Sequence, residues 1–287
     1  MKIPVIILNY NSSDDCRKCV SFLKRQEGVD LEIILVDNCS PDRDKVETLS
    51  REQGCTFIAS PENRGYNAGN NIGLRYAAKK GYEFALIANP DMEFPDKKYI
   101  ITLVEAMNLD EETVIVSSDI IGADGNHQNP LKRDGKCLNN FLWIIEQLGF
   151  YKKYDYLDKP DTSHYCKKVS GCCLMVRIDF IQKIGFFDEY PFLYCEEPIL
   201  SRQVERARKR IFYVATVRAV HHHIASTKGD PVKRFQEWKR SRLYFIKNYS
   251  GSSWIGKRIA YISIALYVIL YTYSYKLRTK RICFLKK

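Results

Sequence analysis

A regular alternation of short apolar runs and amphipathic helical patterns over residues 3–116 constrains the fold of this chain most strongly. Apolar runs of about four to eight residues suit buried strands, and apolar side chains repeated every three to four positions indicate helices. Strands that alternate with helices pair in parallel. We therefore expect an α/β fold with a mostly parallel, doubly wound central sheet. The predicted strands are 3–8, 31–36, 56–59, 84–88 and 114–116, and the predicted helices are 12–26, 44–53, 66–80 and 96–107.

The second half of the chain is less regular. Residues 119–168 are rich in Asp, Asn, Gly and Lys and include an aromatic patch, so we expect an irregular insertion with short elements. The remaining predicted elements are strands at 169–176 and 211–217 and helices at 196–209 and 233–248.

Charge is distributed unevenly along the 287 residues, whose formal net charge is +11. Residues 228–287 hold 15 Lys and Arg against 2 acidic residues, which leaves 30 basic and 32 acidic residues at 1–227. A nucleic-acid-binding protein would carry its basic residues on the folded body, among aromatic side chains. The body is instead near neutral, so we expect no nucleic-acid partner. The domain prediction is one large domain at 1–227 and a basic helical tail at 228–287.

The tail contains an uncharged stretch, 259–275, between basic flanks. As a helix it would be about 25 Å long, slightly short for a hydrocarbon core of about 30 Å. Its tyrosines at 267, 271 and 275 suit a boundary between water and lipid. We favour a helix that lies in the membrane interface, and a helix that spans the bilayer is the alternative.

The cysteines are expected to be free thiols. The N-terminal apolar run contains Pro4 and is too short for a secretory signal, so we expect a cytosolic protein, in which disulfides are rare. Cys16 and Cys19 have no second pair at zinc-binding spacing and fall on one face of a predicted helix, which favours core packing. Cys172 and Cys173 are also expected to pack.

Polar residues follow the first two predicted strands. Asn9, Tyr10 and Asn11 follow one strand, and Asp37 follows the next. Neighbouring parallel strands end at the same edge of a sheet, so an aromatic ring and a carboxylate would meet where a planar base can stack and donate hydrogen bonds. The alternative is that Asp37 is only a turn residue. Farther along, residues 63–73 combine glycines with four asparagines at a helix start, which favours the close approach of an anion.

Asp91 lies in an Asn-Pro-Asp turn directly after the strand 84–88. At that edge of an α/β sheet a carboxylate and diphosphate oxygens can hold a divalent cation, although such tripeptides are also ordinary turns. Asn89 is uncharged, so a second ligand is needed. His221 and His223 share one face of an extended chain and are candidates for it. A solvated strand end with one core histidine is the alternative.

Glu196 and Glu197 precede Pro198, which suits the first turn of a helix. A carboxylate held there can accept the proton of an attacking hydroxyl. The alternative is that both acids only complement the helix dipole.

Together these segments resemble the glycosyltransferase family 2 enzymes of the GT-A fold, particularly the rhamnosyltransferase-like members of bacterial surface polysaccharide assembly (capsule or O-antigen). The resemblance covers residues 3–226. Two positions depart from the family pattern: Asn89 stands at the first acid of an Asp-x-Asp motif, and Ile199 stands where a second acid follows the base. The carrying segments are 6–11, 36–40, 63–73, 89–91, 170–177, 185–189 and 192–202.

This resemblance implies an inverting transferase with Glu197 as base, preceded by Glu196. It implies a divalent metal, Mn²⁺ or Mg²⁺, at Asp91 with His221 or His223. The donor would be a UDP- or dTDP-linked sugar. Its predicted contacts are Asn9, Tyr10, Asn11, Asp37, Asn67, Gly69, Asn70 and Asn89.

The implied acceptor is a lipid-linked glycan or an oligosaccharide. The basic tail would hold the protein against an anionic membrane surface, peripherally at the inner face of the bacterial cell membrane. The alternative to an enzyme is a non-catalytic scaffold that binds a sugar nucleotide within a membrane polysaccharide complex.

Overall fold

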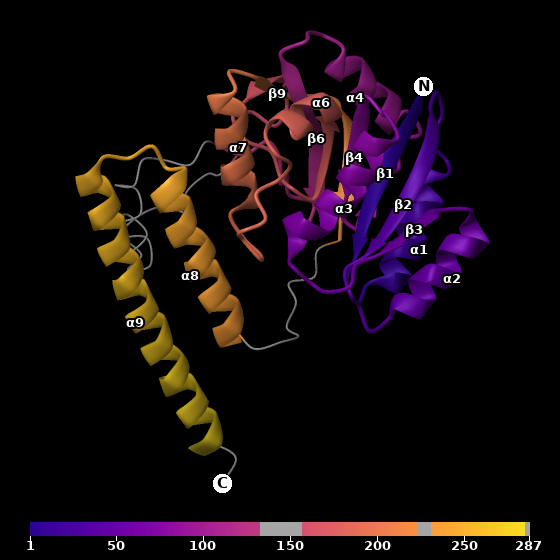
Figure 1. The fold of residues 1–287 in the computed structure, drawn as a ribbon. Coiled ribbons are helices and arrows are strands. Elements are labelled where there is room, and N and C mark those ends of the chain that lie inside the picture. The colour runs from indigo at the N-terminus through magenta and orange to yellow at the C-terminus, as the bar shows by residue number, and fades with distance from the viewer. Residues whose placement is uncertain (133–156, 223–230, 285–287) are drawn as a thin grey trace. The chain divides into compact units, whose positions relative to one another are not determined.

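A computed structural model describes residues 1–132, 157–222 and 231–284, with side chains to residue 273. By its internal contacts the chain forms two units, Met1–Arg133 with Tyr156–Ala225, and Asp134–Asp155 with Ser226–Lys287. The first unit contains the sheet, and the second contains two long helices (Figure 1).

The first unit is built on one nine-stranded sheet with the strand order β3-β2-β1-β4-β8-β6-β9-β5, and β7 pairs with β9. β1 lies parallel to β2 and β4, and β2 lies parallel to β3. β3 and β4 coincide with their predicted ranges. The strands are β1 Lys2–Asn9, β2 Asp30–Asp37, β3 Thr56–Ala59, β4 Phe84–Ala88, β5 Met92–Glu93, β6 Thr113–Gly122, β7 His164–Cys166, β8 Cys173–Arg177 and β9 Arg210–His221.

Helices of the first unit pack on both faces of this sheet. Side chains alternate along a strand, so Ile7 of β1 belongs to one core cluster and Ile6 to the other. The cluster around Ile7 is shared by α1 Ser13–Leu23, α2 Arg43–Gln53 and α4 Tyr99–Met107. The cluster around Ile6 is shared by α3 Tyr66–Lys79, α6 Ile178–Lys183 and α7 Glu196–Arg206. The predicted α/β class is therefore confirmed.

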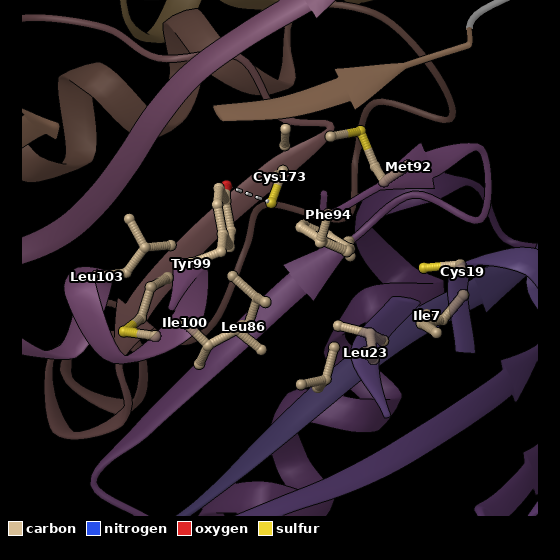
Figure 2. Packing of buried hydrophobic residues seen from close by; sticks show 14 of the residues in the cluster. Ile7, Cys19, Leu23, Leu86, Met92, Phe94, Tyr99, Ile100, Leu103 and Cys173 are labelled. Carbon is tan, nitrogen blue, oxygen red and sulfur yellow. Dashed lines mark hydrogen bonds between the residues drawn. The ribbon is translucent and has the colours of Figure 1, made fainter. Parts of the chain in front are cut away.

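Figure 2 shows the cluster around Ile7, in which cysteines pack as small apolar residues. Cys19 and Cys173 have no exposed surface, and Tyr99 Oη lies 3.3 Å from Cys173 Sγ. Cys16 is equally buried. Each cysteine whose side chain the structure describes is a free thiol. Core packing of the Cys16 and Cys19 pair is thus confirmed.

Beyond β4 the sheet is mixed, which the expectation of a mostly parallel sheet did not specify. β8 runs antiparallel to both β4 and β6, and β5 and β7 run antiparallel to β9. β6 and β9 also extend past their predicted ends at residues 116 and 217, because residues 119–122 of β6 pair with 218–221 of β9. The first residues of the predicted irregular insertion are therefore strand.

The second unit contains α8 Pro231–Asn248 and α9 Trp254–Phe284. α8 begins two residues before its predicted start. α9 is longer than the predicted helix at both ends. Residues Trp254–Tyr273 are long and apolar enough to cross a membrane, and 17% of this window is buried.

Candidate active site

The predicted site residues gather at one edge of the sheet because of its strand directions. The carboxyl ends of β1, β4 and β9 meet the amino end of β8 there. The registers that fix this edge are Asn9 opposite Asp37, Ala88 opposite Cys173 and Gly122 opposite His221. Ligands of α/β sheets bind at this edge.

Asn9 and Asp37 end neighbouring strands and are fully buried. Asn9 Nδ2 donates hydrogen bonds to Asp37 Oδ1 at 2.9 Å and to Asp42 Oδ1 at 3.0 Å. Burial raises the pKa of Asp42, but hydrogen bonds from Ser40, Asn9 and Ser13 lower it to about 2. The ionised Asp42 carboxylate therefore ties together the chain segments that follow β1 and β2.

Tyr10 and Asn11 lie at the surface next to this pair. Tyr10 is 50% exposed, so part of its side chain is accessible to a ligand. Asn11 adopts a positive φ of 55°, and its backbone N donates to Ser40 Oγ at 2.8 Å. The turn after β1 is thus fixed while the neighbouring ring stays accessible.

The asparagines of 63–73 bind mainly to protein. Asn67 Nδ2 donates to the Asp188 carbonyl at 2.8 Å, and Asn70 Nδ2 donates to the Tyr66 carbonyl at 3.1 Å. Asn70 Oδ1 is buried and has no hydrogen-bond partner among the described residues. Contacts of Asn67 and Asn70 with a donor stay predictions.

The glycines of this segment are explained by packing. A side chain at Gly69 would lie 2.5 Å from Leu8 Cδ1, so its absence lets α3 approach β1. Gly65 has a φ of 100°, and a Cβ there would lie 2.3 Å from the Phe192 carbonyl oxygen. That carbonyl accepts a hydrogen bond from Tyr66 N at 3.0 Å. The N–H groups in the first turn of α3 were predicted to face an anion. One of them, that of Tyr66, instead binds the segment that precedes α7. The predicted donor contact of Gly69 stays a prediction.

The Tyr66 hydroxyl links α3 to two chain segments at the sheet edge. Its Oη lies 2.8 Å from both Asn89 Oδ1 and the Gly171 carbonyl oxygen, so these two acceptors share its single proton. Asn89 N donates to the Cys172 carbonyl at 2.8 Å. Burial raises the pKa of Tyr66, so the hydroxyl remains a donor. The orientation of the Asn89 amide is fixed by this contact.

Asp91 and His221 form a contact between the turn after β4 and the end of β9. Asp91 Oδ1 lies 3.3 Å from His221 Nε2, and His222 N donates to the Asp91 carbonyl at 3.0 Å. His221 Nδ1 lies 2.8 Å from Gln128 Oε1. Burial lowers the pKa of His221, but contacts with Asp91 and Cys172 outweigh this and raise it to about 10.

The donor set of this pair fits the predicted metal. Mn²⁺ accepts both carboxylate and imidazole ligands, and Asp91 Oδ1 and His221 Nε2 are close enough to share one ion. Among the side chains that the structure describes, no group of three or more His, Cys, Asp or Glu is arranged to hold an ion. The other ligands would therefore be diphosphate oxygens and water. His223, the second predicted imidazole, lies outside the described residues.

Glu196 and Glu197 start α7 but have different surroundings. Glu197 Oε1 accepts a hydrogen bond from Gly171 N at 3.3 Å. Glu196 Oε1 is buried with no hydrogen-bond partner in the described part of the chain. Burial and the charge of Glu197 raise the pKa of Glu196 to about 7. Backbone hydrogen bonds at Glu196 and Tyr194 oppose this rise but do not cancel it.

Residues 171–172 join the two halves of the site. Gly171 N binds Glu197, and the Cys172 thiol contacts His221, which contacts Asp91. The predicted base and metal ligands are thus assembled around one short segment before β8.

A small cavity lies beside this assembly, with about 20 Å³ of room for water, which is enough for one molecule. Its polar lining includes the side chains of Tyr66, Glu196, Glu197 and Gln203.

Sequence reasoning missed several residues of this assembly. Tyr66 was placed in the helix 66–80 without a partner, and Cys172 was expected only to pack. Gln128 and Asp42 were not singled out. The only available signal for Cys172 was its place in the segment 170–177, because contacts between residues far apart in the chain leave no local pattern.

The sequence pattern of the family described as "Glycosyl transferase family 2" matches residues 5–185. This range includes the donor-side residues and Asp91, and it ends before Glu197 and His221.

Two curated proteins resemble most of the chain. The low-salt glycan biosynthesis hexosyltransferase Agl10 of Haloferax volcanii is 26% identical over 273 residues, which cover 93% of this chain and 81% of that protein. The N-acetylglucosaminyl-diphospho-decaprenol L-rhamnosyltransferase of Mycobacterium tuberculosis is 22% identical over 272 residues, which cover 88% of this chain and 86% of that protein.

A solved structure has the same fold. It is that of the mannosyltransferase PcManGT from Pyrobaculum calidifontis in complex with GDP-Man and Mn²⁺, with a TM-score of 0.56 and 16% identity. The likeness covers 92% of this chain and 69% of that chain. With the family match over more than half of the residues, the chain belongs to glycosyltransferase family 2, as a rhamnosyltransferase-like glycosyltransferase of the GT-A fold.

Proposed function

We propose that this protein moves a sugar, with inversion, from a nucleotide-diphosphate donor to a lipid-linked glycan acceptor of bacterial surface polysaccharide assembly. The observation that carries the proposal is the assembly of Asp91, His221 and Glu197 around residues 171–172 at one edge of the sheet. A single displacement needs a base for the attacking hydroxyl and, close to it, two side chains that bind the metal.

The donor would lie along the edge from β2 to β4. The exposed ring of Tyr10 stacks on the base, beside the buried Asn9 and Asp37 pair. The Asn89 amide, held by Tyr66, faces the sugar diphosphate. A divalent cation held by Asp91 and His221 would neutralise charge on the leaving diphosphate.

Glu197 would act on the acceptor. Its carboxylate takes the proton of the acceptor hydroxyl as the new bond from that oxygen to the anomeric carbon forms and the bond to phosphate breaks. One such displacement inverts the anomeric centre. The Gly171 N–H fixes the carboxylate, and a positioned base contributes about 10² to 10⁴ in rate.

The membrane location is supported by the tail. It holds 15 basic and 2 acidic residues, and each basic residue near an anionic leaflet contributes on the order of 1 kcal/mol. A relative named for a diphospho-decaprenol acceptor is consistent with a lipid-linked substrate. The acceptor would then be presented at the surface to which the tail binds.

A panel of nucleotide sugars with manganese tests the proposal, measured as nucleoside diphosphate release with a lipid-linked acceptor. We expect Glu197→Gln to lose at least about 100-fold in turnover while it still binds the donor. Glu205→Gln, an acid at the other end of α7 that pairs with Arg202, is the matched control and should keep full turnover. Undiminished turnover in Glu197→Gln would remove the assigned base. Donor binding by the wild type without turnover of any acceptor would favour the scaffold alternative.

A further inference from the structure

We infer that the helix pair α8 and α9 docks flat on an anionic lipid bilayer through one face of α9, and that α9 does not cross the bilayer. The inference rests on the proposed membrane location. It does not depend on the catalytic roles of Asp91 or Glu197.

One face of α9 carries a row of exposed apolar side chains, which we call the stripe, and the exposed Arg258 lies between its first two members. Its members are spaced by seven, four, three and four positions, so they share one side of the helix. Their exposed fractions lie between 42% and 65%. The stripe consists of Ile255, Ile262, Leu266, Ile269 and Tyr273.

The opposite face of α9 packs against α8 through aromatic rings. The Tyr271 ring stacks on Phe235 with centroids 4.1 Å apart. The Tyr267 ring meets Trp238 edge to face at 5.4 Å. The tyrosines of α9 therefore lie on two faces. Tyr267 and Tyr271 pack against α8, and Tyr273 lies on the exposed stripe.

α8 accompanies α9 along most of its apolar length. At one end Lys257 Nζ donates to the Lys247 carbonyl at 3.0 Å, and at the other end Phe235 contacts Tyr271. α8 carries six Lys and Arg residues and one acidic residue, Glu237. If α9 spanned a bilayer, these charges would enter the hydrocarbon core beside it, where charged side chains are strongly disfavoured. A flat orientation keeps α8 in water and buries only the stripe.

The charge of the tail identifies the partner as anionic lipid. Lys257 and Arg258 precede the uncharged stretch, and the sequence has four more basic residues at 276–281. A second copy of this chain would bring an equally basic tail to the stripe, and the two would repel. An anionic leaflet attracts the basic residues and accepts the apolar row.

Flotation with vesicles of phosphatidylcholine and phosphatidylglycerol tests the docking face. Ile269→Asp and Thr272→Asp add the same charge to exposed positions of α9, but only Ile269 belongs to the stripe. We expect Ile269→Asp to weaken binding at least about tenfold and Thr272→Asp to change it about threefold or less. Equal losses in the two variants, or equal binding to vesicles of pure phosphatidylcholine, would overturn the proposal. So would stable dimers of the wild type that form without vesicles and are abolished by Ile269→Asp.

Protease added outside sealed vesicles tests the orientation. A peptide tag after Lys287 should be digested as fully as in solution, because a flat α9 leaves the C-terminus outside. A protected tag would mean that α9 spans. Donor binding by the Ile269→Asp variant, measured as thermal stabilisation by a nucleotide sugar, should equal that of the wild type. Vesicle binding without donor binding in the wild type would refute the proposed function and leave this inference standing.

Discussion

Oδ1 of Asp91 lies 3.3 Å from Nε2 of His221, although one residue follows β4 and the other ends β9. The contact depends on the pairing of β5 with β9, which sets Met92 opposite His221. Sheet register, and not a local motif, therefore brings the two proposed metal ligands together. In the proposed site, the single acid of the Asn-Pro-Asp turn would share a divalent cation with this imidazole.

Replacement of Asp91 tests this pair directly. We expect Asp91→Asn to lose the thermal stabilisation that Mn²⁺ with UDP gives the wild type, and to lower turnover by at least about 100-fold, because one charged ligand is removed. Glu93→Gln is the matched control. Its carboxylate lies two residues away and contacts His222 at 3.2 Å. Equal loss of stabilisation in both variants would mean that general surface charge, and not a ligand pair, binds the ion.

The Tyr66 hydroxyl offers a second test. Tyr66→Phe removes the donor to Asn89 and Gly171 without changing the packing of the ring. A buried acceptor that loses its donor costs about 1 to 3 kcal/mol, so we expect a loss of this size in the free energy of unfolding. The KM for the sugar nucleotide should also rise, because Asn89 is no longer oriented. Urea unfolding and steady-state kinetics measure the two effects. A variant that loses stability but keeps its KM would show that Asn89 does not face the donor.

Apart from the two-residue strand β5, which was missed, the strands and helices before residue 113 could be predicted because each is a local pattern. The run 84–88 is apolar throughout, and β4 occupies the same residues. The position of β8 could not be predicted in this way. Its apolar side chains suit either strand direction, and its antiparallel place between β4 and β6 depends on pairing with residues far away in the chain. β9 extends beyond its predicted end at residue 217 because of another contact between distant residues. Arg218 pairs with the buried Asp119 at 2.8 Å, so this polar stretch stays in the sheet.

The residues of the candidate site also differ in how well the sequence predicts them. Residues at strand ends, such as Asn9 and Asp91, carry a sequence signal because polar side chains interrupt apolar runs. The residues that connect these strand ends carry no such sequence signal. Tyr66 looks like any helical aromatic, and its role depends on a contact with Gly171 across the chain. The glycine spacing of α3 does not distinguish a ligand from packing, because close packing and close ligand approach both require the absence of a side chain.

Gly69→Ala separates these two roles of glycine. The added methyl group would lie 2.5 Å from Leu8 Cδ1, so we expect a loss of about 1 to 3 kcal/mol in the free energy of unfolding from overpacking. If packing is the only role, the KM for the donor stays unchanged. Leu8→Ala makes room for the methyl group, so the double variant should be more stable than the sum of the single effects predicts. A raised KM that Leu8→Ala does not restore would return Gly69 to the donor site.

The raised pKa of Glu196 predicts an unusual pH dependence of stability. Burial and the charge of Glu197 raise this pKa from 4.5 to about 7, so between these values the folded protein binds more protons than the unfolded chain. The free energy of unfolding therefore falls as the pH rises through this window, because the folded state must ionise a buried carboxyl group.

Glu196→Gln removes that ionisation. Relative to the wild type, the variant should gain up to about 3 kcal/mol between about pH 5 and about pH 8, since each unit of pKa corresponds to about 1.4 kcal/mol. Urea unfolding across this range measures the gain. Glu205→Gln at the exposed end of α7 is the control, and over the same pH range its difference from the wild type should not show this rise. If the difference between Glu196→Gln and the wild type is also independent of pH, Glu196 ionises at its ordinary pKa. The small cavity that it shares with Gln203 would then have to contain a donor, such as a water molecule, that stabilises the charged carboxylate.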